Sequence, residues 1–193
     1  GATIVNLFQA FFLGILQGAT EFLPVSSSGH LVLVPWLLGW DAPALAFDAV
    51  VHWGTAVAVV AYFWRDWISL VRALTLRRLR TDPSLEPSQG SRDARLAWLI
   101  LLGTVPAALI GWLLEDFFER MFARPPVAAA FLLVTAALLT ASERFGRRER
   151  DLDALAWPDA LFVGLAQALA IFPGISRSGA TISGGLLRKL DRP

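Results

Sequence analysis

The sequence contains no cysteine, a single methionine, a single lysine and few charged residues of either sign. The absence of cysteine excludes disulfide bridges, thiolate metal sites and catalysis by a cysteine nucleophile. Charged residues make up 17 % of the 193 residues, against about 25 % in soluble domains. The net charge of +1 gives no indication of a nucleic-acid partner. Apolar residues amount to 55 % and the mean hydropathy is +0.56, values typical of a membrane protein.

Three apolar stretches, at about 44–64, 96–114 and 125–142, approach the ~20 residues that a membrane-spanning helix needs. Two further apolar segments, 4–23 and 158–172, each run into a proline and a cluster of small polar residues, and each is followed by a short helical segment. Irregular backbone at membrane depth is tolerated only where protein or a cavity surrounds it, which favours re-entrant hairpins.

The sequence therefore predicts an all-α polytopic membrane protein that forms a single membrane domain over residues 1–193. We expect a first re-entrant hairpin at 1–40, three transmembrane helices within 44–142 and a second re-entrant hairpin at 157–190. We expect the Arg-rich segments 65–95 and 143–156 to connect spans, with a polar linker at 81–93 and a short turn at 115–124. If all three stretches span, the Arg-rich segments share one side, which the positive-inside rule makes cytoplasmic.

The two hairpins carry the same pattern of residues. Aligned without gaps, segments 14–29 and 164–179 share a glycine, a glutamine, a phenylalanine and two serines followed by glycine at matching positions. The three spans between them place the hairpins in opposite orientations. The pattern predicts an inverted-topology repeat, in which the broken helices meet near the midplane and build a site there.

The first motif places several chemically active side chains close together. Gln17 and Glu21 share a helix face, and Glu21 is a candidate general base or metal ligand. Ser26 to Ser28 lie at a predicted helix start, where hydroxyls and free N–H groups bind anions. One of these serines is expected to cap the helix, and Ser27 is a candidate nucleophile if a base lies beside it. His30, one helical turn later, can activate a hydroxyl or itself attack phosphorus.

The second motif places Arg177 between Ser176 and Ser178. A planar guanidinium matches phosphate with two hydrogen bonds, and a salt bridge with Glu21 in the empty state is the alternative. Together the two motifs supply what phosphoryl transfer requires, namely positioning and charge neutralisation. For Asp48 and His52, in the first span, hydrogen bonds between helices are favoured over contact with substrate.

Segments 17–30 and 173–181 resemble the bacterial undecaprenyl-diphosphate phosphatases, also called bacitracin-resistance proteins. The resemblance covers essentially the whole chain. It implies a multi-pass enzyme of the bacterial inner membrane that hydrolyses undecaprenyl diphosphate to the monophosphate and phosphate, and so recycles the lipid carrier of cell-wall synthesis. It also implies dependence on a divalent cation such as Mg²⁺ or Ca²⁺.

Site roles follow from the resemblance. It implies Glu21 as acid, base or metal ligand, Ser27 with His30 as the nucleophilic pair, and Arg177 as the clamp on the diphosphate. Which of Ser27 and His30 attacks stays open; we predict Ser27, activated by His30. Many family members carry glutamate where this chain has Gln17, so a metal would rest on Glu21 and the diphosphate. The remaining expected substrate contacts are Ser26, Ser28, Ser176, Ser178 and Gln17.

Three alternatives to this phosphatase share parts of the pattern. Inverted repeats with broken helices are also a transporter architecture, so a flippase for polyprenyl phosphates is the alternative. The acid-phosphatase-like lipid phosphatases need a histidine after their Ser-Arg motif, and none follows Arg177. Family members continue with further spans after the second motif, so we expect those spans to be missing here, which leaves an inactive remnant open. Expected partners are the polyprenyl diphosphate lipid, the bilayer and a second copy of the chain.

Overall fold

The computed structural model describes residues 5–76, 89–122 and 124–191. The predictions for residues 1–4 and 77–88, which include part of the Arg-rich segment and of the polar linker, lie outside the described residues. Within the described part the secondary structure is helical. The β-structure recorded there is an isolated parallel bridge between Arg150 and Leu190.

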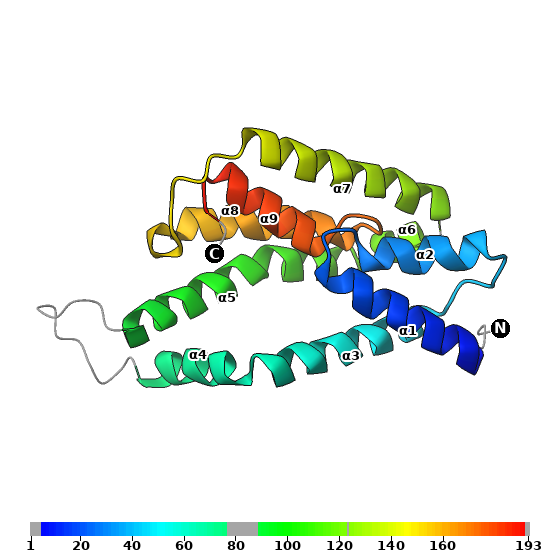
Figure 1. The fold of residues 1–193 in the computed structure, drawn as a ribbon, viewed down its shortest axis with the longest axis horizontal. Helices are drawn as coiled ribbons and strands as arrows, with labels where there is room; N and C mark the ends of the chain where they lie inside the picture. The colour runs from blue at the N-terminus through cyan, green and yellow to red at the C-terminus, as the bar shows by residue number, and fades with distance from the viewer. Residues whose placement is uncertain (1–4, 77–88, 123, 192–193) are drawn as a thin grey trace, which may run out of the picture.

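Three helices are long and apolar enough to cross a membrane, as the sequence predicts. They are α3 (Leu45–Tyr62), α5 (Gln89–Leu113) and α7 (Pro125–Phe145), and they run roughly along the long axis of the molecule (Figure 1). Most of their large apolar side chains are exposed. Exposed apolar area on this scale indicates contact with lipid or with further protein rather than with water.

Two helix–break–helix units accompany the three long helices. The first consists of α1 (Leu7–Phe22) and α2 (Ser27–Leu37). The second consists of α8 (Trp157–Ala168), the 3₁₀ turn η3 (Leu169–Ile171) and α9 (Arg177–Leu187), preceded by the turn η2 at 152–154. Both units are interrupted where the sequence predicts a break in the helix. The helices after the breaks, α2 and α9, each contain 11 residues.

The connections contain more helix than the sequence suggests. Helix α4 (Trp64–Leu76) occupies the start of the Arg-rich connection and packs beside α5, which begins inside the expected linker. Helix α6 (Glu115–Phe122) replaces the expected turn. Two acidic residues in the first turn of α6 and Arg120 in the last complement the helix dipole. Local charge placement thus stabilises a helix where the short apolar pattern indicates none.

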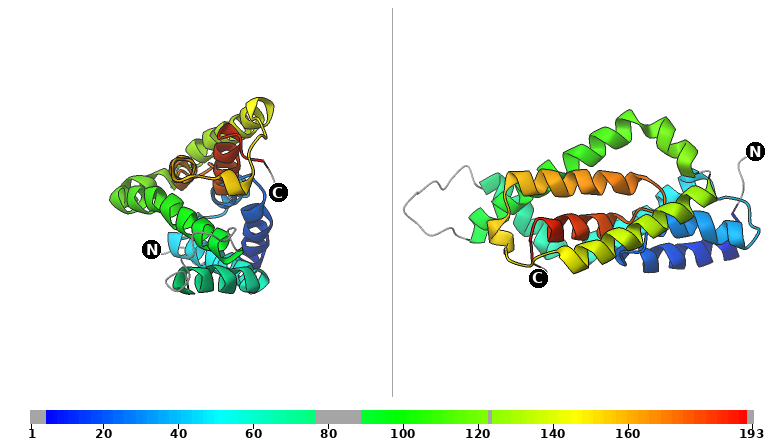
Figure 2. Two further views of the ribbon diagram at one scale, coloured as in Figure 1. Left: turned by 90° about the vertical axis from the view of Figure 1, so that its left-hand side faces the viewer. Right: turned by 90° about the horizontal axis from the view of Figure 1, so that it is seen from above.

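The two breaks lie side by side in the middle of the molecule, and their helix pairs extend in opposite directions (Figures 1 and 2). Gly29 in α2 approaches Gly174 so closely that a Cβ on Gly29 would lie 2.9 Å from the Gly174 Cα. Gly174 has φ +100 and packs against the Ala128 carbonyl of α7. The Ser178 Oγ donates to the Leu23 carbonyl oxygen at 3.3 Å. Glycine at both positions allows this backbone contact.

A buried carboxylate, Asp159, joins the ends of the two helices of the second unit. Asp159 is fully buried, accepts hydrogen bonds of 3.1 and 2.8 Å from Arg150, and accepts one of 2.6 Å from Arg188. The hydrogen bond with Asp159 raises the pKa of the Arg150 guanidinium above its ordinary value. The carboxylate needs these partners, because an unpaired buried charge is strongly destabilising. The cluster therefore ties the start of α8 to the end of α9.

Candidate active site

The start of α2 is shaped by an unusual backbone at Ser26. Ser26 caps the helix with φ 67, in the left-handed region that non-glycine residues rarely adopt. Its hydroxyl accepts from the Gly29 N–H at 3.3 Å and lies 3.3 Å from the Ser28 hydroxyl. Strained backbone of this kind costs about 1–3 kcal/mol and is concentrated at functional sites.

The start of α9 carries the same hydroxyl pattern on a relaxed backbone. Ser176 caps this helix with φ −74, accepts from the Gly179 N–H at 3.1 Å and lies 3.0 Å from the Ser178 hydroxyl. Thr135 of α7 supports the break: its hydroxyl donates to the Gly174 carbonyl at 2.8 Å and accepts from the Ser176 N–H at 3.1 Å. Ser176 and Ser178 therefore repeat the capping and hydroxyl contacts of Ser26 and Ser28, whereas the backbone conformation of the capping serine differs.

Both motifs line one cavity of about 650 Å³. Its wall includes Glu21 and the three serines at the start of α2, and Ser176 with Arg177 at the start of α9. Asp48 and His52 of α3 add a second carboxylate and an imidazole to the wall, and Thr104 and Gln167 also line it. The structure therefore brings the two motifs together, as the repeat predicts, and places two helix N-termini at the same cavity.

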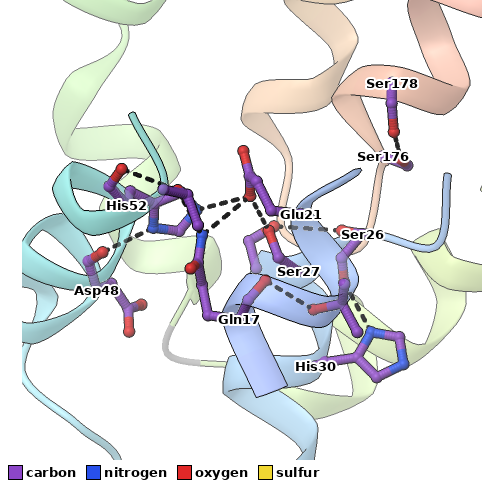
Figure 3. Close-up of polar contacts among 12 residues, drawn as sticks. Gln17, Glu21, Ser26, Ser27, His30, Asp48, His52, Ser176 and Ser178 are labelled. Carbon is purple, nitrogen blue, oxygen red and sulfur yellow. Dashed lines mark hydrogen bonds and ion pairs between the residues drawn. The ribbon is translucent and has the colours of Figure 1, made fainter. Parts of the chain in front are cut away.

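The Glu21 carboxylate is held through one of its oxygens (Figure 3). Oε2 accepts a hydrogen bond of 2.5 Å from the Ser27 hydroxyl and one of 3.2 Å from the Gln17 amide. The same oxygen lies 3.3 Å from the Nε2 of His52. In the described part of the chain, no hydrogen bond or ion pair involves Oε1. Glu21 therefore keeps one oxygen free beside the buried Ser27 hydroxyl.

The structure does not form the predicted contact between Ser27 and His30. The Ser27 hydroxyl turns toward α1 and donates to Glu21, whereas the His30 Nδ1 lies 2.7 Å from the Ser26 carbonyl oxygen. In Figure 3 the His30 ring points away from the Glu21 group, and His30 does not line the cavity. The base beside the Ser27 hydroxyl is thus a carboxylate; a role for His30 on substrate stays a prediction.

Two further predicted substrate contacts lie outside the cavity wall. Gln17 is 1 % exposed, and its amide donates to Glu21 and, at 3.2 Å, to the Thr55 hydroxyl. Ser178 is engaged by Ser176 and by the Leu23 carbonyl. Both residues therefore support neighbouring groups, because helix packing turns their polar atoms toward protein.

Arg177 has the surroundings expected of an anion ligand. The residue is exposed, and within the described ranges its guanidinium makes no hydrogen bond or ion pair. The alternative salt bridge with Glu21 is therefore not formed at the 4.0 Å limit. An arginine at a helix N-terminus, facing a cavity with free donors, is placed to bind a phosphate group.

The contact between helices predicted for His52 is formed, with Glu21 as the partner that the sequence did not identify, and Thr135 was not predicted. A histidine in the middle of an apolar span is costly unless it has a partner or a function, and this was the available signal for His52. Asp48 also lines the cavity, and its Oδ1 is buried without a hydrogen-bond partner among the described residues. For Thr135 the sequence offers no signal, because its partners lie about forty residues away.

Comparison with known proteins decides the family. The family model described as bacitracin resistance protein BacA matches residues 10–193. The chain belongs to this family. Relatives named undecaprenyl-diphosphatase include one from Desulforudis audaxviator, 43 % identical over 97 % of this chain and 68 % of the relative. One from Thermomicrobium roseum is 45 % identical over 98 % of this chain and 69 % of the relative, and one from Chlorobaculum tepidum is 42 % identical over 97 % and 67 %. The chain thus spans about two thirds of the length of these bacitracin-resistance-family relatives.

Proposed function

We propose that this chain carries the catalytic site of a membrane phosphatase that hydrolyses undecaprenyl diphosphate to undecaprenyl phosphate and phosphate, and so recycles the lipid carrier of cell-wall synthesis. The observation that carries this proposal is the 2.5 Å hydrogen bond from Ser27 to Glu21 in a cavity that Arg177 also lines. The family and the names of the relatives support the same activity and the same substrate.

The nucleophile in this proposal is Ser27. As its Oγ bonds to the terminal phosphorus, its proton passes to Oε2 of Glu21 and the bond from phosphorus to the bridging oxygen breaks. Undecaprenyl phosphate leaves with the electron pair of that bond, and a phosphoserine remains. Water then attacks the phosphoserine, Ser27 regains a proton, and inorganic phosphate is released. A positioned carboxylate that takes a proton in this way contributes about 10²–10⁴-fold in rate.

The negative charge of the diphosphate would be stabilised by groups on both sides of the cavity. Arg177 supplies a guanidinium at the start of α9, and Ser26 to Ser28 supply hydroxyls and N–H groups at the start of α2. Two helix N-termini aimed at one cavity favour an anion through their dipoles and their free donors. The serine hydroxyls are held at the two helix starts before substrate arrives, an arrangement that favours stabilisation of developing charge.

A divalent cation, Mg²⁺ or Ca²⁺, stays a proposal for this chain. The described residues contain no group of three or more His, Asp or Glu side chains suited to a metal. The Oε1 of Glu21 is the free carboxylate oxygen beside Ser27. This donor set fits a cation that takes one ligand from Glu21 and the others from diphosphate oxygens and water, as Mg²⁺ commonly does. When bound there, the cation would neutralise diphosphate charge.

The membrane arrangement is part of the proposal. We infer that the two helix–break–helix units are re-entrant hairpins of an inverted repeat, entering a bacterial inner membrane from opposite faces and meeting near its midplane. Their opposed directions and adjoining breaks support this arrangement (Figures 1 and 2). Arg144 lies in the last turn of α7, and arginines 147, 148 and 150 follow the helix. The positive-inside rule makes that end cytoplasmic, so the first hairpin would open to the periplasmic side.

Phosphate release tests the proposed activity directly. The full-length membrane protein, purified in detergent, is expected to release phosphate from undecaprenyl diphosphate, and Ser27→Ala is expected to release none above background. A fluorescent polyprenyl phosphate in vesicles tests the alternative. Movement of that lipid between leaflets without phosphate release would contradict the phosphatase and favour a flippase of inverted-repeat architecture.

A further inference from the structure

His52 lies between two fixed acceptors on the cavity wall (Figure 3). Its Nδ1 lies 2.6 Å from the Asp48 carbonyl oxygen, one turn earlier in α3, and its Nε2 lies 3.3 Å from Oε2 of Glu21. A carbonyl oxygen and an ionised carboxylate both only accept, so each ring nitrogen carries a hydrogen directed at its partner. With both ring nitrogens engaged, the ring has one orientation and presents Nε2 to the carboxylate.

A second contact from α3 reaches the same carboxylate indirectly. The Gln17 amide links the Thr55 hydroxyl to Oε2 of Glu21, with 3.2 Å to each oxygen. Thr55 in turn donates to the His52 carbonyl at 2.9 Å. Glu21 is therefore held by α3 along two routes, one through an imidazole and one through a buried amide.

Packing alone does not account for this placement of α3. Helix α3 has no fully buried side chain in the described structure, although His52 and Thr55 face α1 with polar atoms. A polar pair of this kind inside an apolar span is costly unless it serves a purpose. The other histidine, His30, is engaged by the Ser26 carbonyl and does not line the cavity.

We propose that His52 is a positioning residue that holds the Glu21 carboxylate in line with the Ser27 hydroxyl. The proposal rests on the proposed phosphatase function and adds to it a residue that acts through Glu21 rather than on substrate. His52 contacts Oε2, the oxygen that Ser27 uses, and leaves Oε1 without a partner among the described residues. A displacement of about 1 Å in a reacting group can cost about 100-fold in rate, so this support bears on turnover more than on binding.

The test compares two amides of different length in the full-length protein. In His52→Gln the amide nitrogen can still reach Glu21, whereas in His52→Asn it is too short. We expect His52→Asn to lower kcat about 10-fold to 100-fold with KM changed less than about threefold, because the substrate's own ligands remain. We expect His52→Gln to keep kcat within about threefold of wild type. Val57→Ala, on the exposed side of the same helix, is the control and should match wild type.

Each outcome decides one of the two claims. If the wild-type protein releases no phosphate, the proposed function fails. If the wild-type protein is active and His52→Asn retains its kcat, or loses affinity alone, the positioning role is overturned. Equal loss of kcat in His52→Gln and His52→Asn would also overturn it, since His52 would then act by its own acid–base chemistry. Thermal unfolding in detergent checks that both variants are folded. If His52→Asn is not folded, the kcat of His52→Gln still tests the positioning role.

Discussion

The Ser27 hydroxyl lies 2.5 Å from Oε2 of Glu21, six residues earlier and across the break between α1 and α2. This contact pairs a candidate nucleophile with a base that is a carboxylate and not an imidazole. It depends on the left-handed backbone at Ser26, where the chain turns into α2.

Replacing Glu21 by its amide should remove the base while keeping its shape. In Glu21→Gln the side chain can no longer take the Ser27 proton, so we expect kcat for phosphate release to fall about 100-fold to 10,000-fold. Glu149→Gln, at a half-exposed carboxylate near the end of α9, is the control and should retain activity. Wild-type turnover by Glu21→Gln, measured with undecaprenyl diphosphate, would rule Glu21 out as the base.

Arg177 should bind the diphosphate through the paired N–H donors of its guanidinium and not only through its charge. Arg177→Lys keeps the positive charge but loses the paired donors that match a phosphate. We expect kcat/KM to fall about 10-fold to 100-fold, and the measurement is phosphate release over a range of substrate concentrations. Arg147→Lys, at an exposed arginine outside the cavity, should behave as wild type. Equal kcat/KM in Arg177→Lys and wild type would mean that the guanidinium does not hold the diphosphate.

Gln17 should set how strongly activity depends on a divalent cation. The Gln17 amide donates to Glu21, so Gln17→Glu replaces this donor with a second carboxylate. Like charges at this separation repel unless a cation bridges them. We expect Gln17→Glu to be less active than wild type after chelation with EDTA and to regain more activity on titration with Mg²⁺.

The control for this titration is Gln9→Glu. Gln9 lies in the capping box at the start of α1, where glutamate serves equally well. Its Mg²⁺ response should match that of wild type. Identical Mg²⁺ curves for Gln17→Glu and wild type would contradict a cation beside Glu21.

Thr135 should stabilise the second break. Thr135→Val removes both the donor to the Gly174 carbonyl and the acceptor for the Ser176 N–H, and leaves two buried backbone groups without partners. Each such group costs about 1–3 kcal/mol. We expect a clear loss of thermal stability in detergent, accompanied by a fall in phosphate release because Ser176 leads into Arg177.

Thr140→Val on the same helix provides the matched comparison. Thr140 is exposed, and its hydroxyl donates to the Ala136 carbonyl within α7. Its removal should change the melting temperature little. If the two variants melt at the same temperature, Thr135 does not support the break.

Local signals in the sequence were sufficient for the three long helices and for the two breaks. Pro24 and Pro173, with the serines and glycines after them, mark the breaks, and the apolar runs mark α3, α5 and α7. The amphipathic helices α4 and α6 were not predicted, because short polar helices depend on packing and on charges at their ends.

The partners within the site could be predicted only in part. The repeat indicated that Ser27 and Arg177 would share a cavity, and they do. The direction of the Ser27 hydroxyl depends on a backbone conformation at Ser26 that serine rarely adopts. For His52 the sequence predicted a hydrogen bond to another helix but not its partner, because the contact with Glu21 depends on how α1 and α3 pack.

The most direct test of the account is the identity of the residue that takes the phosphoryl group. Undecaprenyl diphosphate labelled on its terminal phosphate is mixed with the full-length protein, and the reaction is quenched within milliseconds. The labelled peptide is then identified by mass spectrometry. If Ser27 is the nucleophile, an acid-stable phosphoserine forms at Ser27 and is absent in Ser27→Ala. An acid-labile label on His30, or wild-type turnover by Ser27→Ala, would contradict it.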